Sequence, residues 1–187
     1  MTSDQAPPSV TIRTAHPEDA AAVAALHAES WRRHYRGSLS DAYLDGPIEA
    51  ERKAVWTQRL DHPRADQVVL LAVAADVLAG FVCLFLDHET LHASLIDNLH
   101  VDVEWQRRGL GRRLLKEAGD VMLHALPRRP ATLYVLEANA AARRFYDRIG
   151  GVVVEQGRKT EPDGSEVAVL RYAWPTPSAL IEGTSAA

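Results

Sequence analysis

The residues best suited to chemistry form a glycine- and arginine-rich segment in the middle of the chain. Gly109 and Gly111 stand among four arginines, at positions 107, 108, 112 and 113. An apolar run typical of a strand precedes them, and an amphipathic helical pattern follows from Leu110. A glycine turn between a strand and a helix leaves backbone N–H groups unpaired at the positive end of the helix dipole. The segment is therefore predicted to hold a phosphorylated ligand.

Two common phosphate-binding motifs fit this segment poorly. A Walker loop requires G-x-x-x-x-G-K-[ST], and no such pattern follows the predicted strand. A dinucleotide fingerprint shares the G-x-G of Gly109 and Gly111, and Glu137 after a later strand is placed like a ribose-binding acid. Leu114, however, occupies the third glycine position, where the helix must pack closely on the strand. A nucleotide-binding oxidoreductase is therefore the weaker alternative.

Residues 101–111, VDVEWQRRGLG, resemble the acetyl-CoA loop of the GNAT superfamily of N-acetyltransferases, whose signature is [Q/R]-x-x-G-x-[G/A]. Residues 139–146, NAAARRFY, resemble the second motif of that superfamily at the expected distance. The resemblance covers roughly residues 10–172. It implies an N-acetyltransferase that moves an acetyl group from acetyl-CoA, its co-substrate, to a primary amine by direct attack in a ternary complex. A non-catalytic CoA-binding protein on the same fold is the first alternative.

The resemblance also assigns residues to the cofactor. Two strand residues are expected to pair their backbone with pantetheine, namely Leu99 and Val101. The pyrophosphate is expected to be bound by Gln106, Arg107, Arg108, Gly109, Leu110, Gly111 and Arg112. Asn139 is expected to hydrogen-bond the cofactor arm near the start of its helix. Because a helix turns about 100° per residue, not every arginine of the segment can face the ligand.

Tyr146 is the candidate donor of a proton to the departing thiolate. A thiol with a pKa of about 8.5 is a modest leaving group that a phenol can assist. Tyr146 lies two helical turns after Asn139, so both side chains face one direction. The resemblance implies that this direction is the thioester sulfur. The alternative is that Phe145 and Tyr146 only anchor the helix on the sheet.

Asp97 and His100 in the predicted central strand are the candidate bases. The attacking amine must be neutral, although a primary amine has a pKa of about 10. Asp97 is unusual inside a strand and is expected to orient or deprotonate the amine; His100 has a suitable intrinsic pKa near 6.5. By parity, Asp97 cannot share a face with Asn98 and His100 without a β-bulge. A third alternative is that no protein base acts.

The elements that position these residues predict an α+β fold: a single mixed, twisted sheet of about seven strands, flanked by helices on both faces and GNAT-like. The strands 94–103 and 132–136 should be parallel because a helix connects them. The resemblance adds that these two strands splay apart and admit pantetheine. In the central strand, alternation places Leu95, Leu99, Val101 and Val103 on one face and Ile96 on the other. Residues 10–174 are predicted to form one acetyltransferase domain, with a flexible N-terminus at 1–9 and a flexible C-terminal tail at 175–187.

Composition limits the class of partner. The formal net charge of −4 gives no reason to expect nucleic acid, and no apolar run is long enough to span a membrane. The first nine residues do not read as a secretory signal, and one cysteine, Cys83, suits a reducing compartment, so a cytoplasmic protein is expected. The eight histidines show no metal-ligand spacing, so no metal is expected. The acceptor is expected to be a small-molecule or peptide amine, and a homodimer is left open.

Overall fold

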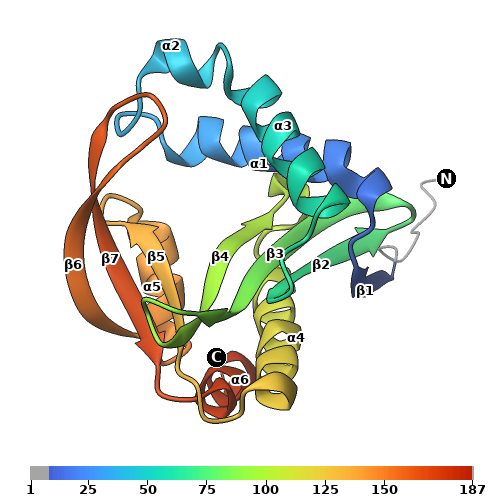
Figure 1. The fold of residues 1–187 in the computed structure, drawn as a ribbon, viewed down its shortest axis with the longest axis vertical. Helices are drawn as coiled ribbons and strands as arrows, with labels where there is room; N and C mark the ends of the chain where they lie inside the picture. The colour runs from blue at the N-terminus through green and yellow to red at the C-terminus, as the bar shows by residue number, and fades with distance from the viewer. Residues whose placement is uncertain (1–8, 187) are drawn as a thin grey trace, which may run out of the picture.

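The computed structural model describes residues 9–186, which form seven strands and six α-helices (Figure 1). The strands are β1 Val10–Thr14, β2 Gln67–Ala74, β3 Val77–His88, β4 Ala93–Val101, β5 Ala131–Leu136, β6 Val152–Thr160 and β7 Glu166–Trp174. The helices are α1 Ala20–His34, α2 Asp41–Leu44, α3 Ile48–Asp61, α4 Leu110–Ala125, α5 Ala140–Arg148 and α6 Pro177–Ala186. Two 3₁₀ turns, Pro17–Asp19 and Val103–Trp105, precede α1 and α4.

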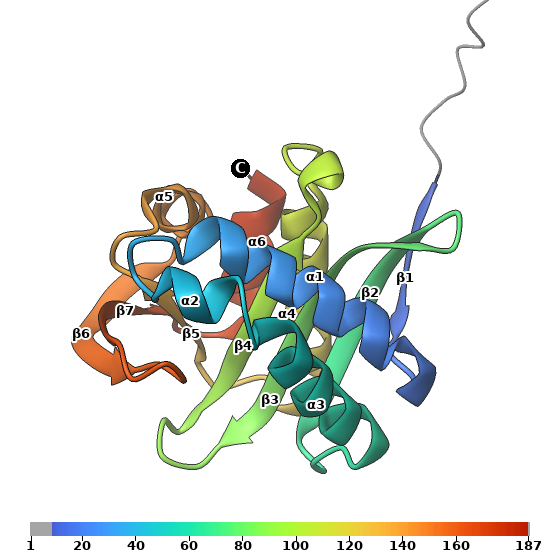
Figure 2. The same cartoon turned by 90° about the horizontal axis from the view of Figure 1, so that it is seen from above.

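All seven strands belong to one sheet, in the order β1-β2-β3-β4-β5-β7-β6. The neighbours β4 and β5 are parallel and every other pair is antiparallel. In Figure 2, α1 and α3 lie over one face of β2 and β3, and α4 lies on the other face. The prediction of a single mixed sheet with helices on both faces is confirmed. Residues 1–8 of the predicted flexible N-terminus lie outside the described residues.

Helix α4 forms because its sequence repeats apolar residues every three or four positions. That face packs against the sheet and is buried along its length at Leu110, Leu114, Leu115, Ala118 and Met122. The helix therefore fixes the direction of the loop that precedes it.

Strands β4 and β5 pair over a short stretch only. Their register joins Ser94, Leu95 and Ile96 to residues 131–133, although β4 continues to Val101 and β5 to Leu136. Beyond Ile96 the two strands diverge, and Figure 1 shows β4 and β5 separating from each other. The predicted splay is confirmed, and it leaves one edge of β4 without a neighbouring strand.

A β-bulge at Asp97 changes which side chains of β4 share a face of the sheet. Asn98 pairs with Cys83 and Ile96 pairs with Leu84, so Asp97 is an extra residue without a partner on β3. The extra residue inverts the alternation, and Ile96, Leu99 and Val101 all contact the core beneath α4. The prediction that Ile96 and Leu99 lie on opposite faces of the sheet was therefore wrong.

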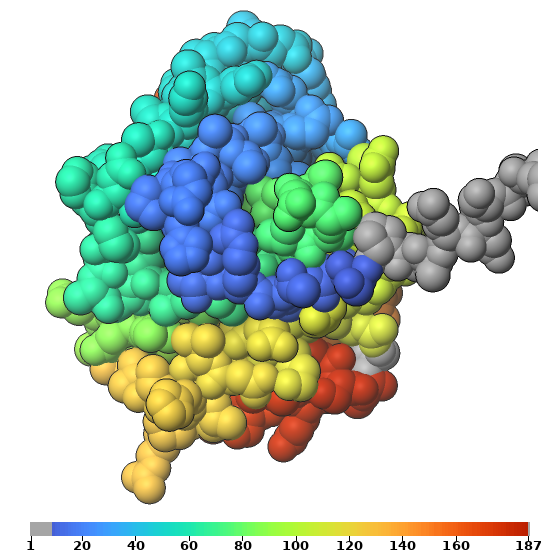
Figure 3. Space-filling view, turned by 90° about the vertical axis from the view of Figure 1, so that its right-hand side faces the viewer, coloured from blue at the N-terminus to red at the C-terminus, as the bar shows by residue number. Residues whose placement is uncertain are grey.

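The C-terminal tail is not an extended flexible segment in the described residues. Residues 177–186 form α6, whose Leu180 is fully buried in the same core as α4. Figure 3 shows α6 against α4 on one face of the molecule. The prediction of a flexible tail was wrong because small residues, which are common in loops, here permit close packing of two helices.

Candidate active site

The loop before α4 presents a set of unpartnered backbone donors. Arg107 has φ +58° and Gly109 has φ +77°, so the chain turns twice through the left-handed region before α4 begins. No acceptor within residues 9–186 takes a hydrogen bond from the amides of residues 107–112. Together with the helix dipole, these amides have the arrangement that an anion-binding site requires.

The four arginines of the loop point in different directions. Arg107 and Arg112 line the adjacent cavity, whereas the guanidinium of Arg113 donates to the Val10 carbonyl at 2.7 Å. The guanidinium of Arg108 lies 5.3 Å from the centre of the Trp105 ring and does not line the cavity. The structure therefore does not bring the Arg108 side chain to the expected cofactor site.

A cavity of about 1280 Å³ extends from this loop through the gap between β4 and β5. We call its two sides the loop half and the far half. The loop half is lined by Leu99, Val101, Gln106, Arg107, Gly109, Leu110, Gly111, Arg112, Asn139, Phe145 and Tyr146. The far half is lined by His27, Ser30, Trp31, Tyr35, Arg52, Arg59, Asp97, Asn98, His100 and Glu161. Every predicted site residue except Arg108 therefore lies on one cavity.

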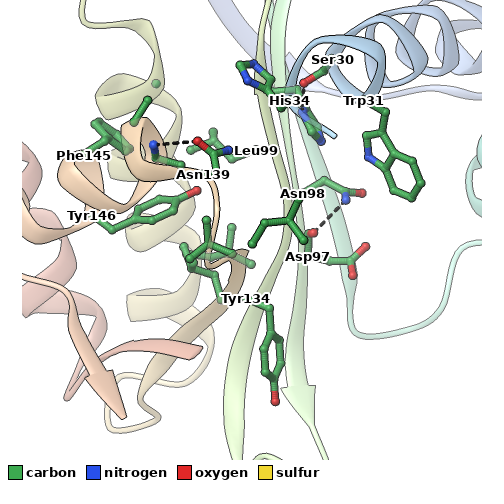
Figure 4. Close-up of a pocket in the computed structure, with 18 of the residues that line it drawn as sticks. Ser30, Trp31, His34, Asp97, Asn98, Leu99, Tyr134, Asn139, Phe145 and Tyr146 are labelled. Carbon is green, nitrogen blue, oxygen red and sulfur yellow. Dashed lines mark hydrogen bonds between the residues drawn. The ribbon is translucent and has the colours of Figure 1, made fainter. Parts of the chain in front are cut away.

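Asn139 and Tyr146 project from α5 toward the gap (Figure 4). The Asn139 side-chain oxygen accepts from the Ala142 amide at 3.1 Å, which caps the helix and fixes its start. The Tyr146 ring packs at 5.6 Å from that of Tyr172 and 6.3 Å from that of Trp174. Burial raises the pKa of the Tyr146 hydroxyl above its ordinary value, so it stays protonated at neutral pH. Tyr146 is thus both a packing residue and a donor at the cavity.

Asp97 forms an ion pair rather than standing free. Its carboxylate accepts from Arg59 at 2.7 Å, and the same guanidinium nitrogen lies 3.3 Å from the Asn98 side-chain oxygen. The bulge brings both side chains to the α3 side of β4, which parity alone forbids. A carboxylate held in this way is fixed in position and can orient its neighbours.

His100 lies among groups that keep it neutral. Its Nδ1 is 2.7 Å from the Ser30 hydroxyl, and its ring lies 4.7 Å from that of His27. Burial and the nearby His34 lower the pKa of His100 to about 3, so its ring is a weak base for an ammonium group. His27 accepts from the Trp56 indole at 2.9 Å and is itself buried.

Sequence reasoning did not single out two charged residues of the far half, Arg52 and Glu161. Arg52 comes from α3, and Glu161 begins the turn between β6 and β7. The Glu161 side chain is only 3% exposed, although a turn before Pro-Asp-Gly predicts exposure. The turn is held over the cavity because the Asp163 carboxylate accepts a hydrogen bond from the Ser40 amide at 2.8 Å. This hydrogen bond lowers the pKa of Asp163 to about 2. No local signal announces this contact between distant segments.

Two further findings concern the described residues as a whole. No helix within residues 9–186 is both long and apolar enough to cross a membrane. Nor do residues 9–186 contain three or more His, Cys, Asp or Glu side chains grouped to hold a metal ion. Cys83 is buried in β3 and does not line the cavity, and burial raises the pKa of its thiol to about 12.

Comparison with known proteins agrees with this geometry. Residues 24–151 match the acetyltransferase (GNAT) family. A protein of Mycobacterium tuberculosis described as a probable N-acetyltransferase is 32% identical over 146 residues, which are 76% of this chain and 79% of that protein. The fold is similar to that of the PaiA N-acetyltransferase of Thermoplasma acidophilum in complex with coenzyme A, with a TM-score of 0.67, 23% identity, and coverage of 86% of this chain and 98% of that one. YncA of Salmonella typhimurium with its cofactor acetyl-CoA gives a TM-score of 0.66 at 18% identity, covering 89% and 94% of the two chains. The glycine loop at the head of α4, the splayed strands and these matches together show that the chain belongs to the GNAT family of acetyltransferases.

Proposed function

We propose that this protein transfers an acetyl group from acetyl-CoA to a primary amine, by direct attack within a ternary complex. The observation that carries the proposal is the row of unpartnered amides at residues 107–112, beside the gap between β4 and β5. A pyrophosphate satisfies such donors, and both relatives of known fold named above were solved with coenzyme A or acetyl-CoA. Arg107 and Arg112 add charge at the same place.

The free edge of β4 suits an extended cofactor arm. The Asp102 amide donates to Ala79 on β3, so alternation turns the backbone groups of Leu99 and Val101 toward the gap. The Gln106 side chain donates to the Val101 carbonyl at 3.1 Å, which agrees with that orientation. The Leu99 amide then supplies a donor for a thioester carbonyl that gains charge.

In the reaction, the amine nitrogen bonds to the acetyl carbon as the carbon–sulfur bond breaks, giving an amide, the CoA thiol and one released proton. Tyr146 donates a hydrogen bond to the departing sulfur from the end of α5. Asp97, held by Arg59, orients groups beside the bulge. Because the lowered pKa of His100 makes it a weak base, water accepts the proton of the acceptor's ammonium in this scheme.

Direct transfer is favoured over an acetyl-enzyme intermediate. An acyl-enzyme needs an accessible nucleophile, and a thiolate is the reactive form of cysteine. Cys83 is the one cysteine of the chain, is fully buried, and has a pKa of about 12. No thiolate therefore forms near the gap.

The experiment measures CoA thiol release with acetyl-CoA and a panel of primary amines, varying both substrates. We expect acceptor-dependent release and intersecting lines in double-reciprocal plots, which indicate a ternary complex. Mass spectrometry after mixing with acetyl-CoA alone should show no added acetyl group on the protein. Stabilisation on heating by CoA without any acceptor-dependent release would instead identify a non-catalytic CoA-binding protein. Stabilisation by NAD but not by CoA would contradict the proposal altogether.

A further inference from the structure

The charged side chains of the far half, and of strands β6 and β7 beside it, form ion pairs with the exception of Arg52. The pairs are Arg59 with Asp97 at 2.7 Å, Arg171 with Glu155 at 2.7 Å, Lys159 with Glu161 at 3.4 Å, and Arg158 with Glu166 at 3.7 Å. Arg52 also lines the cavity, and no carboxylate of the described residues lies within 4.0 Å of its guanidinium. Arg52 is thus the cation of the far half that no carboxylate of the described residues compensates.

Arg52 is held in a defined position by an aromatic surface. Its guanidinium carbon lies 4.7 Å from the centre of the Trp31 ring, and its Nε is buried without a hydrogen-bond partner in the described residues. Trp31 is itself buried and stacks on Tyr35 at 4.6 Å with an interplanar angle of 11°. A guanidinium over an indole keeps its N–H groups free at the edge, where they match the two oxygens of a carboxylate. Unlike Nε, the two Nη groups are not buried and form no hydrogen bond within residues 9–186, so they remain free to donate to an anion in the cavity.

The phosphate groups of CoA do not account for this site. Arg52 belongs to α3, whereas the phosphate loop precedes α4, and Figure 2 shows these two segments at opposite edges of the molecule. Figure 4 shows Asp97 and Asn98 of β4 between Trp31, over which Arg52 lies, and Asn139 at the start of α5. The anion that suits Arg52 must therefore belong to the acceptor.

We infer that the acceptor carries a carboxylate as well as its amine, that is, an amino acid or a related amino-carboxylate, and that Arg52 binds this carboxylate over Trp31. The inference rests on the proposed acetyl transfer and names its substrate class. Polyamine acceptors fit poorly, because their additional ammonium groups would enter a wall that already has an unpaired guanidinium. Glu161, the buried acid of this wall, lies near Lys159 through Oε1, while its Oε2 has no hydrogen-bond partner in the described residues and can accept from the single ammonium group of an amino acid.

The test compares each common amino acid with its carboxamide, which keeps the amine and the side chain but removes the negative charge. A hydrogen bond to a charged group contributes about 1.5–3 kcal/mol, so kcat/KM should favour the acid form by about 10- to 150-fold. In Arg52→Gln that preference should fall to near unity, through loss of activity on the acid alone. Arg52→Lys keeps the charge without the planar fork and should retain part of the preference. Lys53→Gln removes a charge from the exposed side of the same helix and should leave the preference unchanged.

Binding provides a readout that does not depend on turnover. Acid and carboxamide forms are titrated calorimetrically into the wild-type protein saturated with CoA, and the acid should bind more tightly by the same factor. Equal affinity for both forms, a preference that survives in Arg52→Gln, or polyamines as the best acceptors would overturn the inference while leaving acetyl transfer intact. Preferential binding of acids without any acetyl transfer would uphold the Arg52 site and refute the proposed function instead.

Discussion

Replacing Tyr146 by Phe separates its two roles, because the change removes one oxygen and keeps the ring. The ring contacts with Tyr172 and Trp174 remain, and no group of the described residues hydrogen-bonds the hydroxyl. The free energy of unfolding should therefore change by less than about 0.5 kcal/mol. If the hydroxyl hydrogen-bonds the departing sulfur, the transition state loses about 1.5–3 kcal/mol. The turnover number should then fall by about 10- to 150-fold.

The raised pKa of Tyr146 limits this effect. Burial strengthens the hold of the phenol on its proton, and full transfer to a thiolate of pKa about 8.5 is energetically uphill. We therefore expect the hydroxyl to donate a hydrogen bond, while the proton itself comes from the amine or from water. A loss of turnover well beyond a thousandfold would show that Tyr146 transfers its proton completely, and would refute this reasoning.

The assay is steady-state kinetics with the best acceptor, together with thermal unfolding. The KM of the acceptor should stay constant, because the hydrogen bond forms mainly in the transition state. Tyr172→Phe is the matched control: its hydroxyl donates to Asp147 at 2.8 Å, so this variant should lose about 0.5–1.5 kcal/mol of stability and keep its turnover. Wild-type turnover in Tyr146→Phe would reduce Tyr146 to a packing residue.

Three further predictions concern the loop and His100. In Gly111→Val the new Cβ meets Phe145 at an ordinary 3.7 Å, so the fold should survive. Calorimetry should nevertheless show loss of CoA binding, because the new side chain obstructs the approach of the ligand to the loop backbone. Unchanged affinity for CoA would contradict the loop assignment. Arg112→Ala should weaken the affinity for CoA by up to about tenfold, or 1.4 kcal/mol. Arg113→Ala should leave that affinity unchanged, because the Arg113 side chain donates to the Val10 carbonyl. A larger loss of affinity in Arg113→Ala than in Arg112→Ala would be evidence against this geometry. The pKa of His100 is lowered to about 3 in the fold, against a value near 6.5 in the unfolded chain. The contribution of neutral His100 to stability is therefore complete above pH 6.5 and is lost as the pH falls toward 3. Melting curves of His100→Gln should depend less on pH in that window than those of the wild type, and equal dependence would count against a neutral His100.

The sequence predicts the loop half of the site well because its signals are local. Glycines at a strand-to-helix turn, and an apolar period of three to four in α4, are features of neighbouring residues. The side chain of Arg108 lies over Trp105 and does not line the cavity, and sequence does not say which arginine takes that position. The bulge at Asp97 escapes prediction for a related reason: alternation locates a strand but not the point where an extra residue inverts it.

The far half depends on contacts between distant segments, and these are not visible in a single sequence. Glu161 reads as part of an exposed turn, yet that turn is held against Ser40 and buries the acid. Arg52 reads as one of several charges on the face of a helix, and only its position over Trp31 distinguishes it from Lys53. The residues that we propose to contact the acceptor can therefore be found only in the tertiary structure.

Helix α6 shows that small residues can indicate close packing as well as a flexible tail, and Gly183 provides the test. A Cβ at Gly183 would lie 2.0 Å from the Ile149 carbonyl oxygen, a backbone atom that cannot turn aside. Gly183→Ala should therefore displace α6 and lower the free energy of unfolding by on the order of 1–3 kcal/mol in urea titrations. Gly157→Ala is the control, since a Cβ there meets nothing within 4 Å and no positive φ is involved. Equal stability of the two variants would mean that α6 does not pack on the domain in solution, and that the tail is flexible after all.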